Sequence, residues 1–235
     1  TVSESMVEGI LWEAWYDASG TSVDDLVDED PHFPEMPTLR RLITPVDPQP
    51  WGPNCGGSSF RQDSSVDPDA AQDCGQPSES RTTGIDSALA REAGDSDGRT
   101  AALFESPTDI ADHLGTRMRS YFRAPETGDY VFMISSDDFG ELWLGNAPDA
   151  NGDIEQRAEM VASVPGWTEP RQWAKYPEQK SRHITLHEGV FYTIDSLAKE
   201  NAGGDNLAVG VTLPSGIDLR PIPMQLNGTI LLFVD

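Results

Sequence analysis

Apolar and polar residues alternate over short stretches of this chain, a pattern that predicts β-strands rather than long helices. The clearest case is 207–213, where Leu207, Val209 and Val211 share one face. No apolar period of 3.6 residues is sustained anywhere. We therefore expect an all-β fold, an antiparallel β-sandwich or barrel, with strands at 9–20, 116–123, 130–134, 142–144, 184–186, 191–197, 207–213 and 229–234.

Helical signals are few and short. The acidic residues 24–30 are expected to form about one helical turn, and Ser106 with Asp109 predicts a cap for a short helix that ends at His113. Residues 31–53 contain many prolines, which exclude a central strand or a helix interior there.

Residues 47–100 differ from the rest because they are rich in Gly, Ser, Asp and Pro and poor in branched apolar residues. Such a composition buries too little apolar area to fold alone. We expect a polar surface insertion in a single domain that spans 1–235. The only cysteines, Cys55 and Cys74, favour one disulfide in this segment and hence an oxidising compartment, and two free thiols are the alternative.

Charge narrows the classes of partner. The chain has 16 Lys and Arg against 40 Asp and Glu, a net charge of −24. Such a surface repels nucleic acid and anionic membranes, and no apolar run approaches the ~20 residues of a membrane span. The start at Thr1 without Met suggests a processed or excised fragment. The acidity suits either an extracellular protein in a salty medium or a protein that binds divalent cations.

Two oxygen-rich segments are candidates for such a cation site. Asp137 and Asp138 follow the strand 130–134, and neighbouring carboxylates can share one ion only if the backbone bends between them, for instance at a cis peptide. Glu200–Asn206 combines carboxylates, amides and glycines between two strands. Calcium takes roughly 6–8 oxygen ligands in flexible geometry. The alternatives are an acidic turn for the first segment and an ordinary hairpin loop for the second.

Four separated stretches resemble the protective-antigen fourteen-kilodalton domain family, the lectin-like β-sandwich of bacterial toxins, glycosidases, bacterial adhesins and fungal flocculins. The stretches read GILWEAW, MRSYFRAPETGDYVFMISSDDFGELWLG, GWTEPRQWAKYPEQKS and KENAGGDNLAVGVTLPSG, and begin at residues 9, 118, 166 and 199. The resemblance is to the bacterial branch and covers about 7–46 and 100–225. Residues 47–100 are an insertion relative to it.

The resemblance implies a sugar site built on calcium. Sugar-binding members hold Ca²⁺ with an aspartate pair joined by a cis peptide and with a loop near the penultimate strand, and vicinal sugar hydroxyls complete the shell. Here the pair corresponds to Asp137 and Asp138. The implied loop positions are a side-chain ligand at Glu200 or Asn201, backbone carbonyls near Ala202 and Gly204, and Asp205 as a further candidate.

The segment 166–181 is expected to border the sugar site. Trp167 and Gln179 are the candidates for sugar contact, beside Asp137, Asp138 and Asn201. Trp173 and Tyr176 lie in the same segment, and packing under the loop is the alternative for all four, more for Trp173 than for Gln179.

The sequence thus predicts a calcium-dependent carbohydrate-binding module of a secreted or surface adhesin, part of a larger multidomain protein, with cell-surface glycans or polysaccharides as partners. One alternative is a structural or protein-binding sandwich that calcium only stiffens. A glycoside hydrolase is disfavoured, because it needs two carboxylates about 5–9.5 Å apart, one of them protonated, and a shared calcium keeps both ionised. We expect no enzyme activity.

Overall fold

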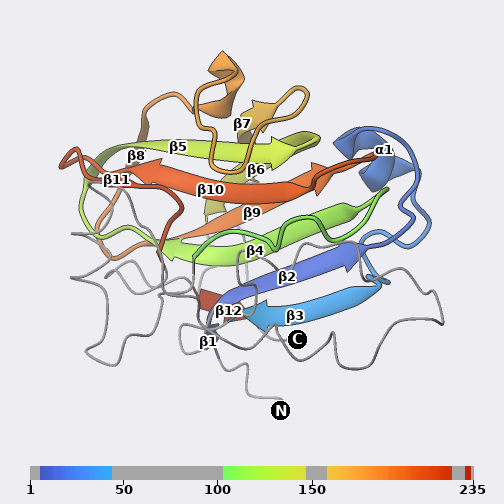
Figure 1. The fold of residues 1–235 in the computed structure, drawn as a ribbon. Coiled ribbons are helices and arrows are strands. Elements are labelled where there is room, and N and C mark those ends of the chain that lie inside the picture. Colours follow the sequence, from blue (N-terminus) through green and yellow to red (C-terminus); the bar gives the residue numbers. More distant parts are fainter. Residues whose placement is uncertain (1–5, 44–102, 147–157, 224–230, 234–235) are drawn as a thin grey trace, which may run out of the picture.

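A computed structural model describes residues 6–43, 103–146, 158–223 and 231–233 and shows two packed antiparallel sheets (Figure 1). The larger sheet contains β1 (Met6–Glu8), β2 (Ile10–Trp15), β3 (Leu39–Ile43), β4 (Gly115–Arg123), β6 (Phe139–Asn146), β7 (Glu159–Val164), β9 (Phe191–Lys199) and β12 (Leu231–Phe233). The smaller one contains β5 (Gly128–Asp137), β8 (Ile184–Leu186), β10 (Asn206–Thr212) and β11 (Asp218–Leu219). The predicted antiparallel β-sandwich is confirmed.

The core lies between the two sheets. Met118 and Phe122 project from β4 as the alternation predicted, and the ring of Phe122 meets that of Phe132 on β5 edge-on, with centroids 5.5 Å apart. Val209 and Val211 of β10 are fully buried in the same cluster. Period-2 alternation therefore explains the core, since each strand presents one apolar face to the other sheet.

One short helix covers the outer face of the larger sheet at one end. Helix α1 (Val23–Asp28) confirms the expected helical turn, and Ser22 caps it by accepting a hydrogen bond from the backbone N–H of Asp25. Its Leu26 packs with Trp15 and Ala18. The only other helix of the described residues is one 3₁₀ turn at Pro177–Gln179. None of the described helices has the length and apolarity to cross a membrane.

The expected helix at 106–113 is wrong. Its backbone N–H groups bind another part of the chain instead of forming a helical ladder: those of Ile110 and Ala111 donate to the Asp205 carboxylate, and that of His113 donates to the Asn201 carbonyl oxygen. Asp109 and His113 also have positive φ angles of 55° and 58°, which a right-handed helix excludes.

Four of the observed strands were not expected, namely β1, β3, β7 and β11. Strand β3 lies in the proline-rich segment, but it pairs with β2 alone among the described strands, so it is an edge strand, where prolines can lie close by. Strand β7 pairs with β6 at the other side of the sheet. The expected insertion 47–100, with Cys55 and Cys74, lies outside the described residues. The disulfide and the single domain over 1–235 stay predictions.

Candidate metal centre

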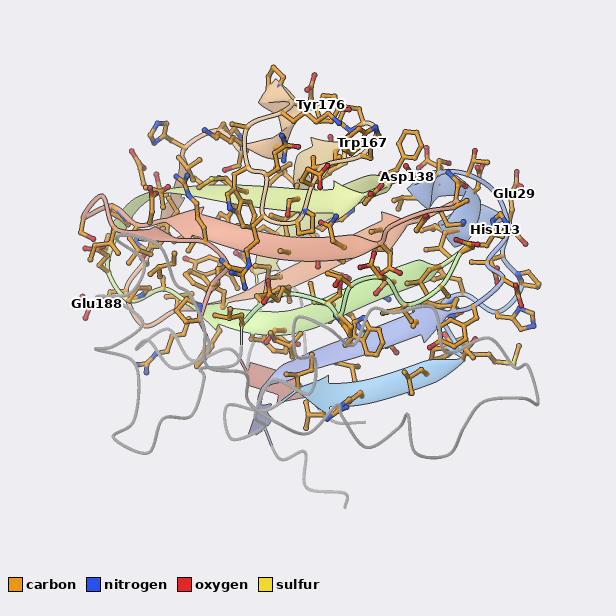
Figure 2. The ribbon with its side chains drawn as sticks, viewed as in Figure 1. Glu29, His113, Asp138, Trp167, Tyr176 and Glu188 are labelled. Carbon is orange, nitrogen blue, oxygen red and sulfur yellow. The ribbon has the colours of Figure 1, made fainter. Side chains whose placement is uncertain are left out.

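The candidate site lies where the chain passes twice between the sheets. After β5 it crosses to β6 of the larger sheet, and after β9 it crosses back to β10 of the smaller one. The register pairs Asp137 with Asn206 and Phe139 with Lys199. Residue 138 and the loop 200–205 therefore lie side by side at one end of the sandwich, the end at which Figure 2 shows Asp138 near His113 and Glu29.

The aspartate pair has the expected backbone, because the Asp137–Asp138 peptide is cis. Asp138 also contacts the second loop directly. Its Oδ2 accepts hydrogen bonds from the backbone N–H and from Nδ2 of Asn201, both at 3.1 Å. The two segments that the sequence singled out are thus joined by hydrogen bonds.

The loop 200–205 carries side-chain oxygens without donors. Glu200 is 2 % exposed, and neither of its carboxylate oxygens has a hydrogen-bond partner among the described residues. Asn201 Oδ1 is likewise buried and unpartnered within the described part of the chain. Buried polar atoms are normally satisfied, so these three oxygens lack the donor or cation that their burial requires.

Asp205 has a different role. Its Oδ2 accepts hydrogen bonds from the backbone N–H groups of Ile110 and Ala111. Its backbone carbonyl oxygen accepts a hydrogen bond from the backbone N–H of Asp109. This carboxylate therefore fixes segment 109–113 over the loop. A second carboxylate, Asp112, accepts from the backbone N–H of Gly203, at 3.2 Å.

The glycines allow the loop to approach the carboxylates closely. Gly203 has φ of +126°, in the region that favours glycine. A Cβ on Gly204 would lie 3.2 Å from Asp109 Oδ1 and 3.8 Å from Asp137 Oδ2. Asp109 therefore joins the site, although the sequence marked it only as a helix cap.

Burial and mutual repulsion make these carboxylates hard to ionise. The pKa of Glu200 is raised to about 8, first by burial and then by the charges of Asp138 and Asp137. Burial and Asp138 raise the pKa of Asp137 to about 6. Burial also raises the pKa of Asp205 to about 6, against its two backbone hydrogen bonds. A divalent cation would remove the repulsion and hold these groups ionised.

The donor set fits calcium better than a softer metal. The atoms available are carboxylate, amide and backbone oxygens, the ligands that calcium takes. Among the described residues, no three Asp, Glu, His or Cys side chains are already grouped as metal ligands. A cation would therefore depend also on Asn201 Oδ1 and on loop carbonyls such as those of Ala202 and Gly204, the positions that the resemblance implied.

The segment 166–181 is attached beside the aspartate pair by Thr168. The backbone N–H of Thr168 donates to the Ser136 carbonyl oxygen at 2.8 Å, and its Oγ1 accepts from the Ser136 N–H at 3.0 Å. Asn206 Nδ2 donates to the Thr168 carbonyl oxygen. Since Ser136 precedes Asp137, this anchor brings Trp167, which is 47 % exposed, near the site (Figure 2).

The two candidates for sugar contact in this segment differ in exposure. Trp167 is at the surface, with the Lys175 ammonium 3.0 Å from its ring centroid on one face. Gln179 is fully buried: its Oε1 accepts from the N–H groups of Lys175 and Tyr176, and its Nε2 donates to the carbonyl oxygens of Ile134 and Gln172. Its amide is thus used inside the segment rather than at the rim.

Tyr176 and Trp173 are both partly buried, and Tyr176 packs against the core. For Tyr176 this matches the alternative interpretation, packing under the loop.

Thr21 was not foreseen at the site, yet its carbonyl oxygen accepts a hydrogen bond from Asn201 Nδ2 at 3.2 Å. No local pattern reveals such a contact, because the two residues are 180 positions apart.

Comparison with known proteins gives one match to a protein family. Residues 114–213 match the sequence model of the GLEYA domain, a range that includes both crossovers and the whole loop 200–205. The match covers fewer than half of the residues. It does not confirm the bacterial branch that the resemblance suggested.

Several solved structures are similar at low identity. The epithelial adhesin 9 A domain of Candida glabrata, in complex with Galβ1-4GlcNAc, is 15 % identical, with a TM-score of 0.49 over 98 % of this chain and 91 % of that one. The PA14 sugar-binding domain of an RTX adhesin is 12 % identical, with a TM-score of 0.45 over 90 % and 93 %. The PA14 domain of the antifreeze protein MpAFP is 14 % identical, with a TM-score of 0.41 over 92 % and 87 %. These likenesses are distant.

Proposed function

We propose that this chain is a calcium-dependent carbohydrate-binding module of a secreted or cell-surface adhesin, and one part of a larger protein. The observation that carries the proposal is the set of three buried, unpartnered oxygens, two on Glu200 and one on Asn201, beside the Asp137–Asp138 pair. A protein that folds around such oxygens needs a cation to balance them.

Asp137, Asp138, Glu200 and Asn201 would hold the calcium, together with carbonyl oxygens of the loop at Ala202 and Gly204. Bound calcium supplies a positive charge and coordination positions that neighbouring sugar hydroxyls can fill. Asp109 lies against the loop at Gly204, and its backbone N–H donates to the Asp205 carbonyl oxygen. Hydrogen bonds from Asn201 to Asp138 and from Ile110 to Asp205 hold the loops beside one another. The ion would draw their oxygens into one coordination shell.

The sugar would be held between the ion and segment 166–181. Trp167 offers an exposed aromatic ring next to the aspartate pair, and apolar sugar faces pack on such rings. Gln179 supports this segment from inside and is proposed to act on the sugar only through Trp167 and Tyr176. One site of this kind gives weak affinity, about mM to µM, so firm attachment would need several copies.

This role requires no catalysis. A glycosidase needs one carboxylic acid that gives up a proton and one carboxylate placed across the glycosidic bond, whereas a shared calcium would keep Asp137 and Asp138 ionised together. The proposal therefore treats both aspartates as ligands only.

The test is a glycan array with added calcium and with EDTA, on the wild-type chain and on Asp138→Asn. Asn keeps an oxygen that can accept from Asn201 but removes the charge, so we expect glycan binding only for the wild type in calcium. Glu188→Gln, an exposed carboxylate at the opposite end (Figure 2), is the matched control and should bind normally.

The outcomes separate the alternatives. Calcium binding by calorimetry without any glycan hit would replace the lectin role with the structural one, in which calcium stiffens the sandwich. Glycan binding that persists in EDTA and in Asp138→Asn would remove calcium from the mechanism.

A further inference from the structure

A buried lysine lies next to the candidate metal centre. Lys199 is the last residue of β9, is 0 % exposed, and pairs with Gly115 of β4 on one side and Phe139 of β6 on the other. Its neighbour Ala198 belongs to the core. Since alternate residues of a strand face opposite ways, Lys199 points to the outer face, which α1 covers.

The ammonium of Lys199 has no direct ionic partner. Its Nζ donates to the backbone carbonyl oxygen of Glu200 at 2.6 Å. Among the described residues, no carboxylate oxygen lies within 4.0 Å of it. Lysine is almost never fully buried unless its charge is compensated, so the compensation must come from charges farther away.

Carboxylates act on this ammonium from farther away than an ion pair. The pKa of Lys199 is lowered, first by burial, and the charges of Glu200 and Asp138 at the metal centre, then of Asp25 and Asp30 near α1, oppose this. The attraction is mutual. The same lysine charge therefore reduces the cost of burying Glu200 and Asp138 side by side when no metal is present.

We propose that Lys199 is the internal counter-cation of the metal centre: it balances the carboxylates in the calcium-free protein and, by repelling the ion, limits the affinity for calcium. This inference rests on the proposed function. Lys199 is not a ligand, since an ammonium has no free electron pair. It acts on the site through its charge, from the layer beneath it.

A consequence is that the site exchanges calcium more readily than its carboxylates alone would suggest. A unit charge at several ångströms inside a protein changes an ion's binding constant strongly, because screening by solvent is incomplete there. We expect that removing the lysine charge tightens calcium binding by about tenfold or more.

The experiment compares Lys199→Met and Lys199→Gln with the wild type by calorimetric titration with calcium. Methionine fills a similar volume without charge, and glutamine keeps a donor for the Glu200 carbonyl oxygen. Both should bind calcium about tenfold more tightly. Lys180→Met removes an exposed lysine and is the control for net charge, with an expected change below about twofold.

A second readout needs no calcium. In EDTA, and at a pH above the raised pKa of Glu200 (about 8) so that this carboxyl is charged, Glu200→Gln is introduced into the wild type and into Lys199→Met. Unfolding by urea is then measured for all four proteins. If Lys199 compensates Glu200, removing the glutamate charge stabilises the Lys199→Met protein more than it stabilises the wild type.

The possible outcomes separate the role of Lys199 from calcium binding itself. Unchanged or weaker calcium binding in both Lys199 variants, or additive effects in the four-protein cycle, would overturn the inference while leaving calcium binding itself intact. Tighter calcium binding in Lys199→Met but not in Lys199→Gln would assign the effect to the lost hydrogen bond and would also overturn the inference. If the wild type does not bind calcium at all, the proposed function fails, and the cycle in EDTA still tests charge compensation.

Discussion

Replacing Glu200 with glutamine should stabilise the calcium-free protein and weaken calcium binding at the same time. The substitution keeps the shape of the side chain and removes its charge. Few substitutions are expected to stabilise a protein without calcium and also weaken its binding of calcium. This pair of effects is therefore specific to a buried carboxylate that serves as a cation ligand.

The size of the first effect follows from the burial of Glu200. Its pKa is raised from 4.5 to about 8. At pH 7 this carboxyl is therefore protonated in the folded protein, although pH 7 lies about 2.5 units above its pKa in the unfolded chain, and the difference destabilises the fold. Each unit corresponds to about 1.4 kcal/mol, which gives at most about 3.5 kcal/mol. Gln would leave buried amide atoms without partners, at a cost of about 1–2 kcal/mol. We therefore expect a net stabilisation of about 1–2 kcal/mol.

The assay is urea unfolding followed by tryptophan fluorescence, in EDTA and in excess calcium. Calcium at 100 times its dissociation constant stabilises the wild type by about 2.7 kcal/mol. Loss of one carboxylate ligand should weaken calcium binding by about tenfold or more, or about 1.4 kcal/mol. The variant should be the more stable protein in EDTA and should lose that advantage in calcium.

Glu188→Gln is the control, because Glu188 is exposed at the far end of the sandwich (Figure 2). It should change neither condition by more than about 0.5 kcal/mol. A Glu200→Gln protein that is less stable than the wild type in EDTA and binds calcium normally would refute the reasoning.

Three further predictions follow from described contacts. In EDTA, the free energy of unfolding should fall as the pH rises from about 5.5 to 8.5, because the raised pKa values of Asp137 (about 6) and Glu200 (about 8) favour folding only while these groups are protonated; a flat or rising profile would contradict this. Glu13→Gln should lower the free energy of unfolding in urea by about 2–3 kcal/mol, because the buried Glu13 carboxylate binds two arginines. Arg182→Ala is the control: its ion pair is exposed, so it should lower the free energy of unfolding by less than about 1 kcal/mol. Trp167→Ala should lower glycan affinity about tenfold or more on the array while calorimetry gives an unchanged calcium affinity; equal losses of both would place Trp167 in the support of the ion.

The strands could be predicted where burial is one-sided. Met118 and Phe122 alternate with partly exposed residues, and they face the core as expected. Strand β7 carried a similar signal, since Ala162 and Val164 alternate and are both buried. This signal is short, because only Ala162 and Val164 of β7 are buried on the core face while Met160 is half exposed.

The candidate site could be predicted only in part. Asp137, Asp138 and the loop 200–205 stand out locally, and the structure brings them together. Asp109 and Thr21 could not be found from the sequence, because contacts with residues about a hundred or more positions away bring them to the loop. The burial of Gln179 could not be predicted either, because it is a polar residue in a polar segment, yet its amide bonds four backbone groups inside the fold.

The pairing of β1 with β12 has a mechanical consequence. Met6 lies opposite Phe233, and Glu8 lies opposite Leu231, so the first and last described strands meet with their outer ends together. Tension applied to those ends would break the hydrogen bonds between β1 and β12 one pair after another rather than all at once. The load would act on this short ladder first, before it reaches the pairing of β2 with β4, so the crossovers that carry the carboxylates would not be the first part of the sheet to yield.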